Sequence, residues 1–284
     1  MVTLLGLCAA LAYGAADFFG GAASRRTSTL SALLISVPVG LLLLLLGAVA
    51  TGGTPTLGGL AWGLAAGTAG GAGMITFYRA LARGPMSVVA PVSALSAAVV
   101  PVAVGALRGE RLNPVALFGV LLCLAAIALV SMEDSKIPRE AHAGRIITGG
   151  PVVAAFSGAT FGIFFVLLRE AGTGSGLWPL VTARSGNVLV LTVAILLSGR
   201  RSLARPAGAT LALAIGSGAL DAGANLLYFL ATNAGLLSLA AVLASLYPAV
   251  TVLLARMVYY ERLRLIQRIG MGVAVAGIAL VTAG

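Results

Sequence analysis

The stretch GERLNPVALFGVLLCLAAIALV, residues 109–130, returns as YERLRLIQRIGMGVAVAGIALV, residues 260–281. Each stretch contains Glu-Arg-Leu followed by an apolar run that is long enough to cross most of a lipid bilayer. Glu110 corresponds to Glu261, which fixes the offset at 151 positions in a chain of 284 residues. An offset of about half the chain length indicates that the chain consists of two related halves.

The repeat extends beyond that stretch. The matched pairs outside it are Gly84 and Gly235, Ser87 and Ser238, and, after a slip of one residue, Tyr78 and Tyr228. Inside it, the repeated residues are Glu110, Arg111, Leu112, Gly119, Ala125, Ile127, Ala128, Leu129 and Val130, which become Glu261, Arg262, Leu263, Gly270, Ala276, Ile278, Ala279, Leu280 and Val281. Apolar matches arise readily by chance in such a chain, so the polar and glycine matches carry the inference.

Hydropathy predicts an all-α integral membrane protein. A transmembrane helix needs roughly 20 mostly apolar residues, and the chain contains about ten such runs. The predicted spans are 2–23, 28–50, 57–82, 85–107, 112–132, 148–169, 176–198, 207–231, 236–256 and 263–283. No basic residue precedes the first run, and a signal peptide would need a basic segment there, so we expect this run to be retained.

The overall composition agrees with lipid as the solvent. Hydrophobic residues make up 60% of the chain and charged residues only 9%, whereas soluble domains carry about a quarter charged residues. The net charge of +10 does not indicate nucleic-acid binding, because the basic residues lie in short gaps between the apolar runs. That placement is typical of membrane proteins, whose cytoplasmic loops are rich in arginine and lysine.

We therefore expect ten transmembrane helices in two inverted five-helix repeats, residues 1–132 and 148–284, joined by a loop at 133–147. An odd number of spans per repeat turns the second copy upside down relative to the first. Inverted repeats are common in secondary transporters, whose substrate sites lie near the membrane midplane where the repeats meet.

The basic residues predict that both termini face away from the cytoplasm. Only Arg108, Arg111 and Arg169 fall in the loops on the side of the termini. The residues on the other side are Arg25, Arg26, Arg79, Arg83, Lys136, Arg139, Arg145, Arg200, Arg201, Arg205, Arg256, Arg262, Arg264 and Arg268. Such a bias places the richer side in the cytoplasm, and we expect the protein to lie in the cell membrane.

The chain resembles the EamA-type branch of the drug/metabolite transporter superfamily over nearly its whole length. The residues that carry the resemblance are Tyr78-Arg79-Ala80-Leu81, Gly84-Pro85, Gly109-Glu110-Arg111-Leu112, Leu246-Tyr247-Pro248, Tyr260-Glu261-Arg262-Leu263, Gly270 and Gly277. The second copy departs from the usual Gly-Glu by having Tyr260. The resemblance implies ten helices around a central cavity and transport of a small metabolite, such as an amino acid, a sugar or a drug.

Three charged residues fall inside predicted spans, where a charge is costly and usually functional. Asp221 lies halfway along the eighth span with Asn225 on the same helical face, and Arg184 lies in the seventh span with Asn187 on its face. We predict that these four residues line the substrate cavity and that Arg184 faces Asp221. A purely structural ion pair is the alternative.

Asp17, Tyr78 and Tyr228 are further candidate substrate-site residues. Asp17 lies near one end of the first span, where contact with the interface is the competing explanation. If the repeats are inverted, Tyr78 and Tyr228 lie near opposite faces and could cap the cavity, although tyrosine is also ordinary at a membrane interface. Glu110 and Glu261 are each expected to open a helix and to accept hydrogen bonds from its free amides.

Glycine and proline positions predict helix packing and kinks. Gly63, Gly67 and Gly71 form a stripe of small residues that permits close helix packing. Three prolines, Pro91, Pro101 and Pro248, interrupt helical hydrogen bonding at equivalent spans of the two halves. They predict either plain kinks or hinges for alternating access.

The sequence offers no catalytic, cofactor or metal site. Cys8 and Cys123 lie in apolar runs, His142 is the only histidine, and no phosphate-binding loop is present. We therefore expect a secondary transporter that is driven by a proton or an exchanged metabolite. It would contact membrane lipid, bind no nucleic acid, and act as a monomer or homodimer. A lipid-carrier flippase and a membrane scaffold or sensor are the alternatives.

Overall fold

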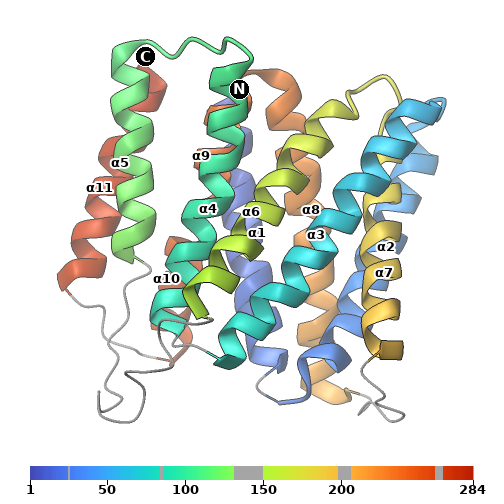
Figure 1. Ribbon diagram of the computed structural model, residues 1–284. Helices are drawn as coiled ribbons and strands as arrows, with labels where there is room; N and C mark the ends of the chain where they lie inside the picture. Colours follow the sequence, from blue (N-terminus) through green and yellow to red (C-terminus); the bar gives the residue numbers. More distant parts are fainter. Residues whose placement is uncertain (25, 84–85, 131–149, 198–205, 260–264, 284) are drawn as a thin grey trace.

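The computed structural model describes residues 1–24, 26–83, 86–130, 150–197, 206–259 and 265–283. Within these ranges the chain forms eleven α-helices and no β-strand (Figure 1). The helices are α1 (Val2–Ser24), α2 (Thr29–Thr51), α3 (Leu57–Arg83), α4 (Met86–Leu107), α5 (Pro114–Val130), α6 (Gly150–Glu170), α7 (Trp178–Leu197), α8 (Gly208–Ala234), α9 (Leu237–Ala244), α10 (Tyr247–Tyr259) and α11 (Leu265–Ala283).

Local sequence signals explain where α2 begins and ends. Ser28 is the N-cap residue, and its hydroxyl accepts a hydrogen bond of 3.2 Å from the amide of Ser31, which satisfies one of the free amides of the first turn. The helix ends at Gly52 and Gly53, whose φ angles are 72° and 102°. Glycine adopts this left-handed conformation without the steric cost that a side chain would add.

The ninth predicted span differs from the prediction, because it is divided into α9 and α10. The break lies at Ser245 and Leu246, directly before Tyr247-Pro248. Pro248 has no amide hydrogen, so it cannot donate to the carbonyl of Ala244, and its ring would clash there. The proline was expected to kink or hinge this span, and in the structure the helix is interrupted one turn before it. Pro101 lies within a continuous α4.

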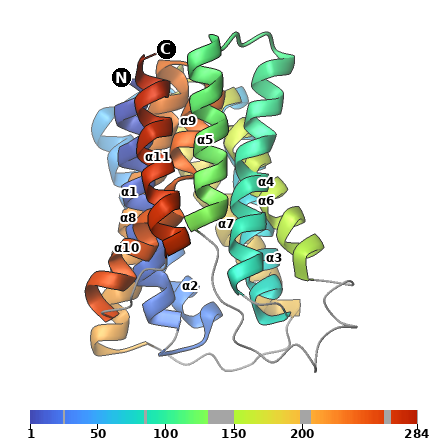
Figure 2. The same ribbon diagram turned by 90° about the vertical axis from the view of Figure 1, so that its left-hand side faces the viewer.

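The helices alternate in direction between two faces of the molecule (Figures 1 and 2). We call the face that carries the beginning of α1 and the end of α11 the upper face, as it is drawn in Figure 1. The upper face also carries the connections from α2 to α3, α4 to α5, α6 to α7 and α8 to α9. The opposite end of the bundle, which we call the lower face, carries the ends of α1, α3 and α7.

Close packing between α3 and α7 confirms the predicted role of the glycine stripe. A Cβ atom at Gly63 or Gly67 would overlap the backbone carbonyls of Pro179 and Ala183 on α7, and one at Gly71 would lie 2.9 Å from the Cβ of Val190. The missing side chains therefore let the two backbones touch. This contact fixes α7, which carries Arg184.

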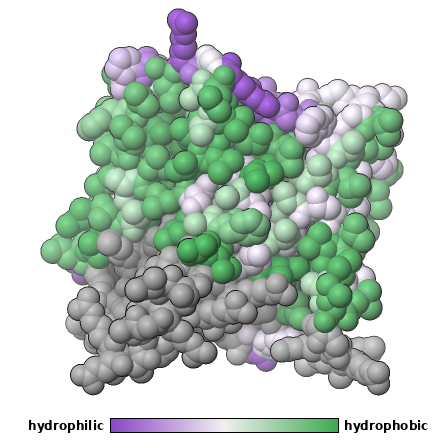
Figure 3. Space-filling view, in the orientation of Figure 1, coloured by the Kyte–Doolittle hydropathy of each residue, from purple (hydrophilic) through white to green (hydrophobic). Residues whose placement is uncertain are grey.

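The outer surface is apolar, as a membrane protein requires. Five helices, α1, α2, α6, α7 and α8, are long and apolar enough to cross a membrane, and shorter apolar helical segments accompany them. On the side shown in Figure 3 the hydrophobic residues cover the body of the bundle, and hydrophilic residues gather along the upper rim. Exposed leucines on α2, including Leu42 and Leu46, would face lipid. The described part of the chain is all-helical, and its apolar helices are those of a multi-pass membrane protein.

Candidate functional site

A cavity of about 180 Å³ lies inside the bundle. Its lining residues come from eight helices, α1, α2, α3, α4, α6, α7, α8 and α10. A smaller recess of about 40 Å³ shares Asp17, Ser36 and Ser217 with the cavity. The recess extends to Ser24 at the end of α1, so the cavity leads toward the lower face.

Arg184 and Asp221 form an ion pair in the wall of this cavity, as the sequence predicted. The helices that contain these two residues, α7 and α8, both pack against α2. The guanidinium passes close to Gly40 of α2, where a Cβ atom would lie 3.1 Å from its Nε atom. The arginine side chain is 8% exposed and the aspartate side chain 34% exposed. The carboxylate therefore faces the open space, while the guanidinium lies behind it.

Asn225 supports the carboxylate from behind. Its side-chain amide donates to the backbone carbonyl of Asp221 at 2.7 Å and to the Oδ2 atom of the same residue at 3.3 Å. The hydroxyl of Tyr13 donates to the Oδ1 atom of Asn225 at 3.0 Å. Asn225 is buried and is not among the lining residues, so it orients Asp221 and Tyr13 rather than facing the cavity itself.

Asp17 is an exposed residue that lines both the cavity and the recess. Within the part of the chain that the structure describes, its carboxylate has no hydrogen bond or ion pair. Arg26, one of the arginines near the end of the first span, forms no described ion pair with it. The structure thus places Asp17 on the inner wall, at the junction of the two spaces.

Aromatic side chains form much of the remaining wall. Tyr13 lies edge-on to Phe165 and to Tyr247, with ring centroids 6.3 and 6.4 Å apart. Across α3 and α6, Phe77 and Phe161 make a second edge-on pair at 6.4 Å. None of these aromatic residues was among the site residues predicted from the sequence. Tyr13 carried a usable signal, because it lies one helical turn before Asp17 on the same face.

Two other predicted site residues, Asn187 and Tyr228, lie away from the cavity. Asn187 faces Gly70 of α3, and its Oδ1 atom is buried without a hydrogen-bond partner among the described residues. Tyr228 is fully buried, with its ring 4.3 Å from that of Phe165 and its hydroxyl 3.5 Å from the carbonyl of Phe165. It therefore lies behind the cavity wall. Tyr78 belongs to α3, and its side chain lies outside the described residues.

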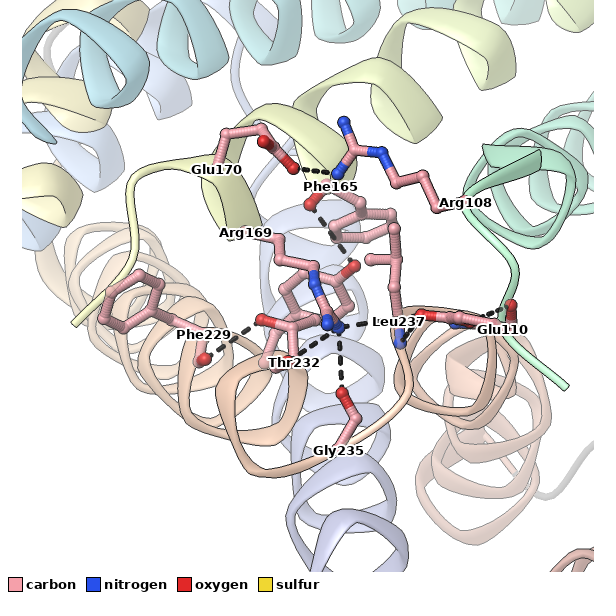
Figure 4. A network of polar contacts seen from close by, with 11 residues as sticks. Arg108, Glu110, Phe165, Arg169, Glu170, Phe229, Thr232, Gly235 and Leu237 are labelled. Atoms are coloured by element: carbon pink, nitrogen blue, oxygen red, sulfur yellow. Dashed lines mark hydrogen bonds and ion pairs between the residues drawn. The ribbon is translucent and has the colours of Figure 1, made fainter. Parts of the chain in front are cut away.

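A polar network joins the end of α6 to the α8–α9 and α4–α5 connections, which belong to the upper face (Figure 4). Its centre is Glu110, which lies before α5 rather than inside it. Its carboxylate accepts hydrogen bonds from the backbone amides of Leu237 and Ser238, at 2.7 and 3.1 Å, and from the Ser238 hydroxyl at 2.6 Å. Glu110 was expected to cap its own helix, but it caps α9 in the other half of the chain. Glu261, its counterpart, lies outside the described residues.

Arg169 joins the same network from the end of α6. Its guanidinium donates to the carbonyls of Thr232 and Gly235, both at 2.8 Å, and lies 3.8 Å from the Glu110 carboxylate. A cation at the end of α8 and an anion at the beginning of α9 both match the dipoles of these helices. Arg108 and Glu170 form a further ion pair nearby (Figure 4). The network thus connects α6, the α8–α9 connection and the α4–α5 connection.

Known proteins place the chain in a family. One solved crystal structure superposes with a TM-score of 0.74 at 19% sequence identity, covering 99% of this chain and 96% of that chain, which supports the fold alone. No curated protein matches the sequence significantly. The family model for EamA-like transporters matches residues 1–132 and 148–283. The chain therefore belongs to the EamA-like transporter family of the drug/metabolite superfamily.

Proposed function

We propose that the protein is a secondary transporter that moves a small metabolite across the cell membrane by alternating access. The observation that carries the proposal is the cavity, whose walls combine charged and aromatic side chains from eight helices of both halves. Concave sites with a few polar groups in an otherwise apolar wall are typical of small-molecule binding. Within that cavity, Asp17, Asp221 and Arg184 are the proposed substrate-binding residues, and Asn225 holds Asp221 in place.

Helix packing supports two inverted five-helix repeats, if α9 and α10 count as one interrupted span. Under that pairing α1 corresponds to α6, and α3 to α8. The packing of α1 against α8 then has its counterpart in the packing of α6 against α3. In the same way α4 corresponds to α9 and α10, and the packing of α6 against α4 matches the packing of α1 against α9 and α10. The last helices of the two repeats, α5 and α11, correspond to each other and pack together. The two matched segments, 1–132 and 148–283, agree with this division.

The cavity and the polar network suggest which side is closed. The space continues toward the lower face, whereas buried side chains such as Leu168, Tyr228 and Phe229 fill the bundle between the cavity and the upper face. Above them, Glu110 and Arg169 join α6 to the α8–α9 connection. We propose that this is the closed outer gate of an inward-facing state, and that transport requires it to separate.

Uptake into proteoliposomes tests the proposal. The purified full chain would be reconstituted and assayed with amino-acid, sugar and drug-like solutes, with a proton gradient or with unlabelled solute inside for exchange. Asp221→Asn should remain folded but impair uptake, because the exchange removes the cavity charge at nearly constant volume. Thr192→Val is the control, since Thr192 is exposed on α7 and lies outside both the cavity lining and the polar network.

The same experiment separates the alternatives. Movement of a labelled lipid between leaflets without solute uptake would identify a flippase instead. A scaffold or sensor would move neither, and a transporter assignment could not survive that result with protein that is folded and inserted. Dependence of uptake on ATP without any dependence on a gradient or on exchange would contradict secondary transport.

A further inference from the structure

We infer that the cavity takes an organic monocation with an apolar or aromatic body, whose charged group binds at the Asp17 carboxylate. The inference rests on the proposed transport function and names the chemical class of the substrate. Three independent features of the wall carry it: the sign of the accessible charge, the unpaired state of Asp17, and the aromatic rings around the space.

The accessible charge in the cavity is negative. Three charged residues line the space, Asp17, Asp221 and Arg184, so their formal sum is one negative charge. The only cation among them is already paired with Asp221 and is 8% exposed, whereas the Asp221 side chain is 34% exposed. An anionic solute would have to compete with the Asp221 carboxylate for the guanidinium.

Asp17 is the carboxylate without a partner. Asp221 is balanced by Arg184 and held by Asn225, while Asp17 forms no hydrogen bond or ion pair in the described part of the chain. An unpaired charge within a membrane span is costly, and such residues generally pair or face water or a ligand. A bound cation would supply the missing partner at the point where the cavity and its recess join.

The rings around the cavity suit a cation with an apolar body. Tyr13, Phe165 and Tyr247 form one edge-on cluster, and Phe77 and Phe161 form another. Aromatic faces attract ammonium groups within about 6 Å, and the rings also bury apolar surface of the ligand. Leu33, Val37 and Met74 complete a wall that offers few partners for the many hydroxyls of a sugar.

Tyr247 is held at this wall by the interrupted ninth span. It is the first residue of α10, and α1 approaches it closely at Gly14, where a Cβ atom would lie 2.7 Å from the Tyr247 carbonyl oxygen. The hydroxyl of Thr251 donates to the carbonyl of Gly14 at 3.1 Å. The break in the helix and the close approach of α1 thus place Tyr247 beside Tyr13, one turn away from Asp17.

Equilibrium binding to the purified full chain in detergent tests the inference. The probe is radiolabelled benzyltrimethylammonium, and the comparison ligand is phenylacetate, which has a similar ring and the opposite charge. We expect the cation to bind in preference to the anion. Asp17→Asn should weaken cation binding by about tenfold or more, which corresponds to about 1.4 kcal/mol. Asp17→Glu keeps the charge and should retain binding, and Thr192→Val, outside the cavity lining, should bind as the parent does.

Each outcome decides a different claim. Equal binding of phenylacetate, or cation binding unchanged by Asp17→Asn, would overturn the inference. The comparison of the two ligands uses the parent protein, so it stands even if a variant does not fold. Uptake of an anionic or neutral solute in proteoliposomes without cation binding would remove the substrate class and leave transport intact. Cation binding that depends on Asp17 without any uptake would support the ligand class and contradict the proposed transport.

Discussion

At the scale of single residues, the ion pair between Arg184 and Asp221 determines how the cavity wall responds to substitution. The guanidinium is almost fully buried, so removing its partner leaves a poorly solvated charge. We expect Asp221→Leu to lower the free energy of unfolding by about 2 kcal/mol, in the range for losing a hydrogen bond to a charged group. The double variant Arg184→Met, Asp221→Leu should recover most of that loss, because no charge is then stranded.

Thermal unfolding of the purified variants, followed by loss of the monodisperse peak, measures both effects. A double variant less stable than Asp221→Leu alone would contradict this account of the pair. Sequence spacing was sufficient to predict the pair, because a hairpin with two charges at similar depth leaves few other partners. Sequence spacing was not sufficient to place the side chains of Asn187 and Tyr228. Their orientations depend on how α7 and α8 are rotated against α3 and α6.

At the scale of helices, the position of α8 depends on a glycine that lets its backbone touch the backbone of α2. A Cβ atom at Gly218 would overlap the backbone of Ser36 on α2, whereas one at Gly223 would meet nothing within 4 Å. Gly218→Ala should therefore push α8 away from α2 and destabilise the protein. Gly223→Ala is the matched control, and it should be neutral or stabilising by up to about 1 kcal/mol, since alanine favours helix over glycine. If the two variants unfolded at the same midpoint, the contact at Gly218 would not be what positions α8.

The Glu110 carboxylate, which caps α9, is the contact between helices most directly linked to opening of the proposed outer gate. We expect Glu110→Gln to weaken the outer gate, because the amide loses the charge that faces Arg169 and one of the acceptor atoms for α9. Phe165→Cys, in a background of Cys8→Ala and Cys123→Ala, reports on access to the cavity. Labelling by an impermeant maleimide applied to the upper face should become several-fold faster, while Thr192→Val, an exposed position on α7 outside the network, should leave the rate unchanged. A rate that Glu110→Gln leaves unaltered would show that the cap is not part of a gate.

Sequence reasoning was weakest for such contacts between distant segments. Hydropathy predicted the apolar helices, and the constant offset of 151 residues predicted a repeat. The offset also marked Glu110, Gly235 and Ser238 as repeated residues, but spacing alone could not show that the first meets the other two across the halves of the chain. The division of the ninth span likewise needed the fold, because a proline in a transmembrane helix is compatible with a kink, as well as with a break.

At the scale of the whole molecule, the charge distribution predicts how the protein is inserted. Both chain ends lie at the upper face (Figures 1 and 2), and the loops rich in arginine belong to the opposite end of the predicted topology. Because such loops remain in the cytoplasm, the upper face should be external, and the cavity should open to the cytoplasm. A phosphatase that is active only outside the cytoplasm should therefore be active when fused after Gly284 and inactive when fused after Arg83, at the end of α3. The reverse pattern would turn the molecule over, so that the network around Glu110 would close the cytoplasmic side and the same cavity would be open to the exterior.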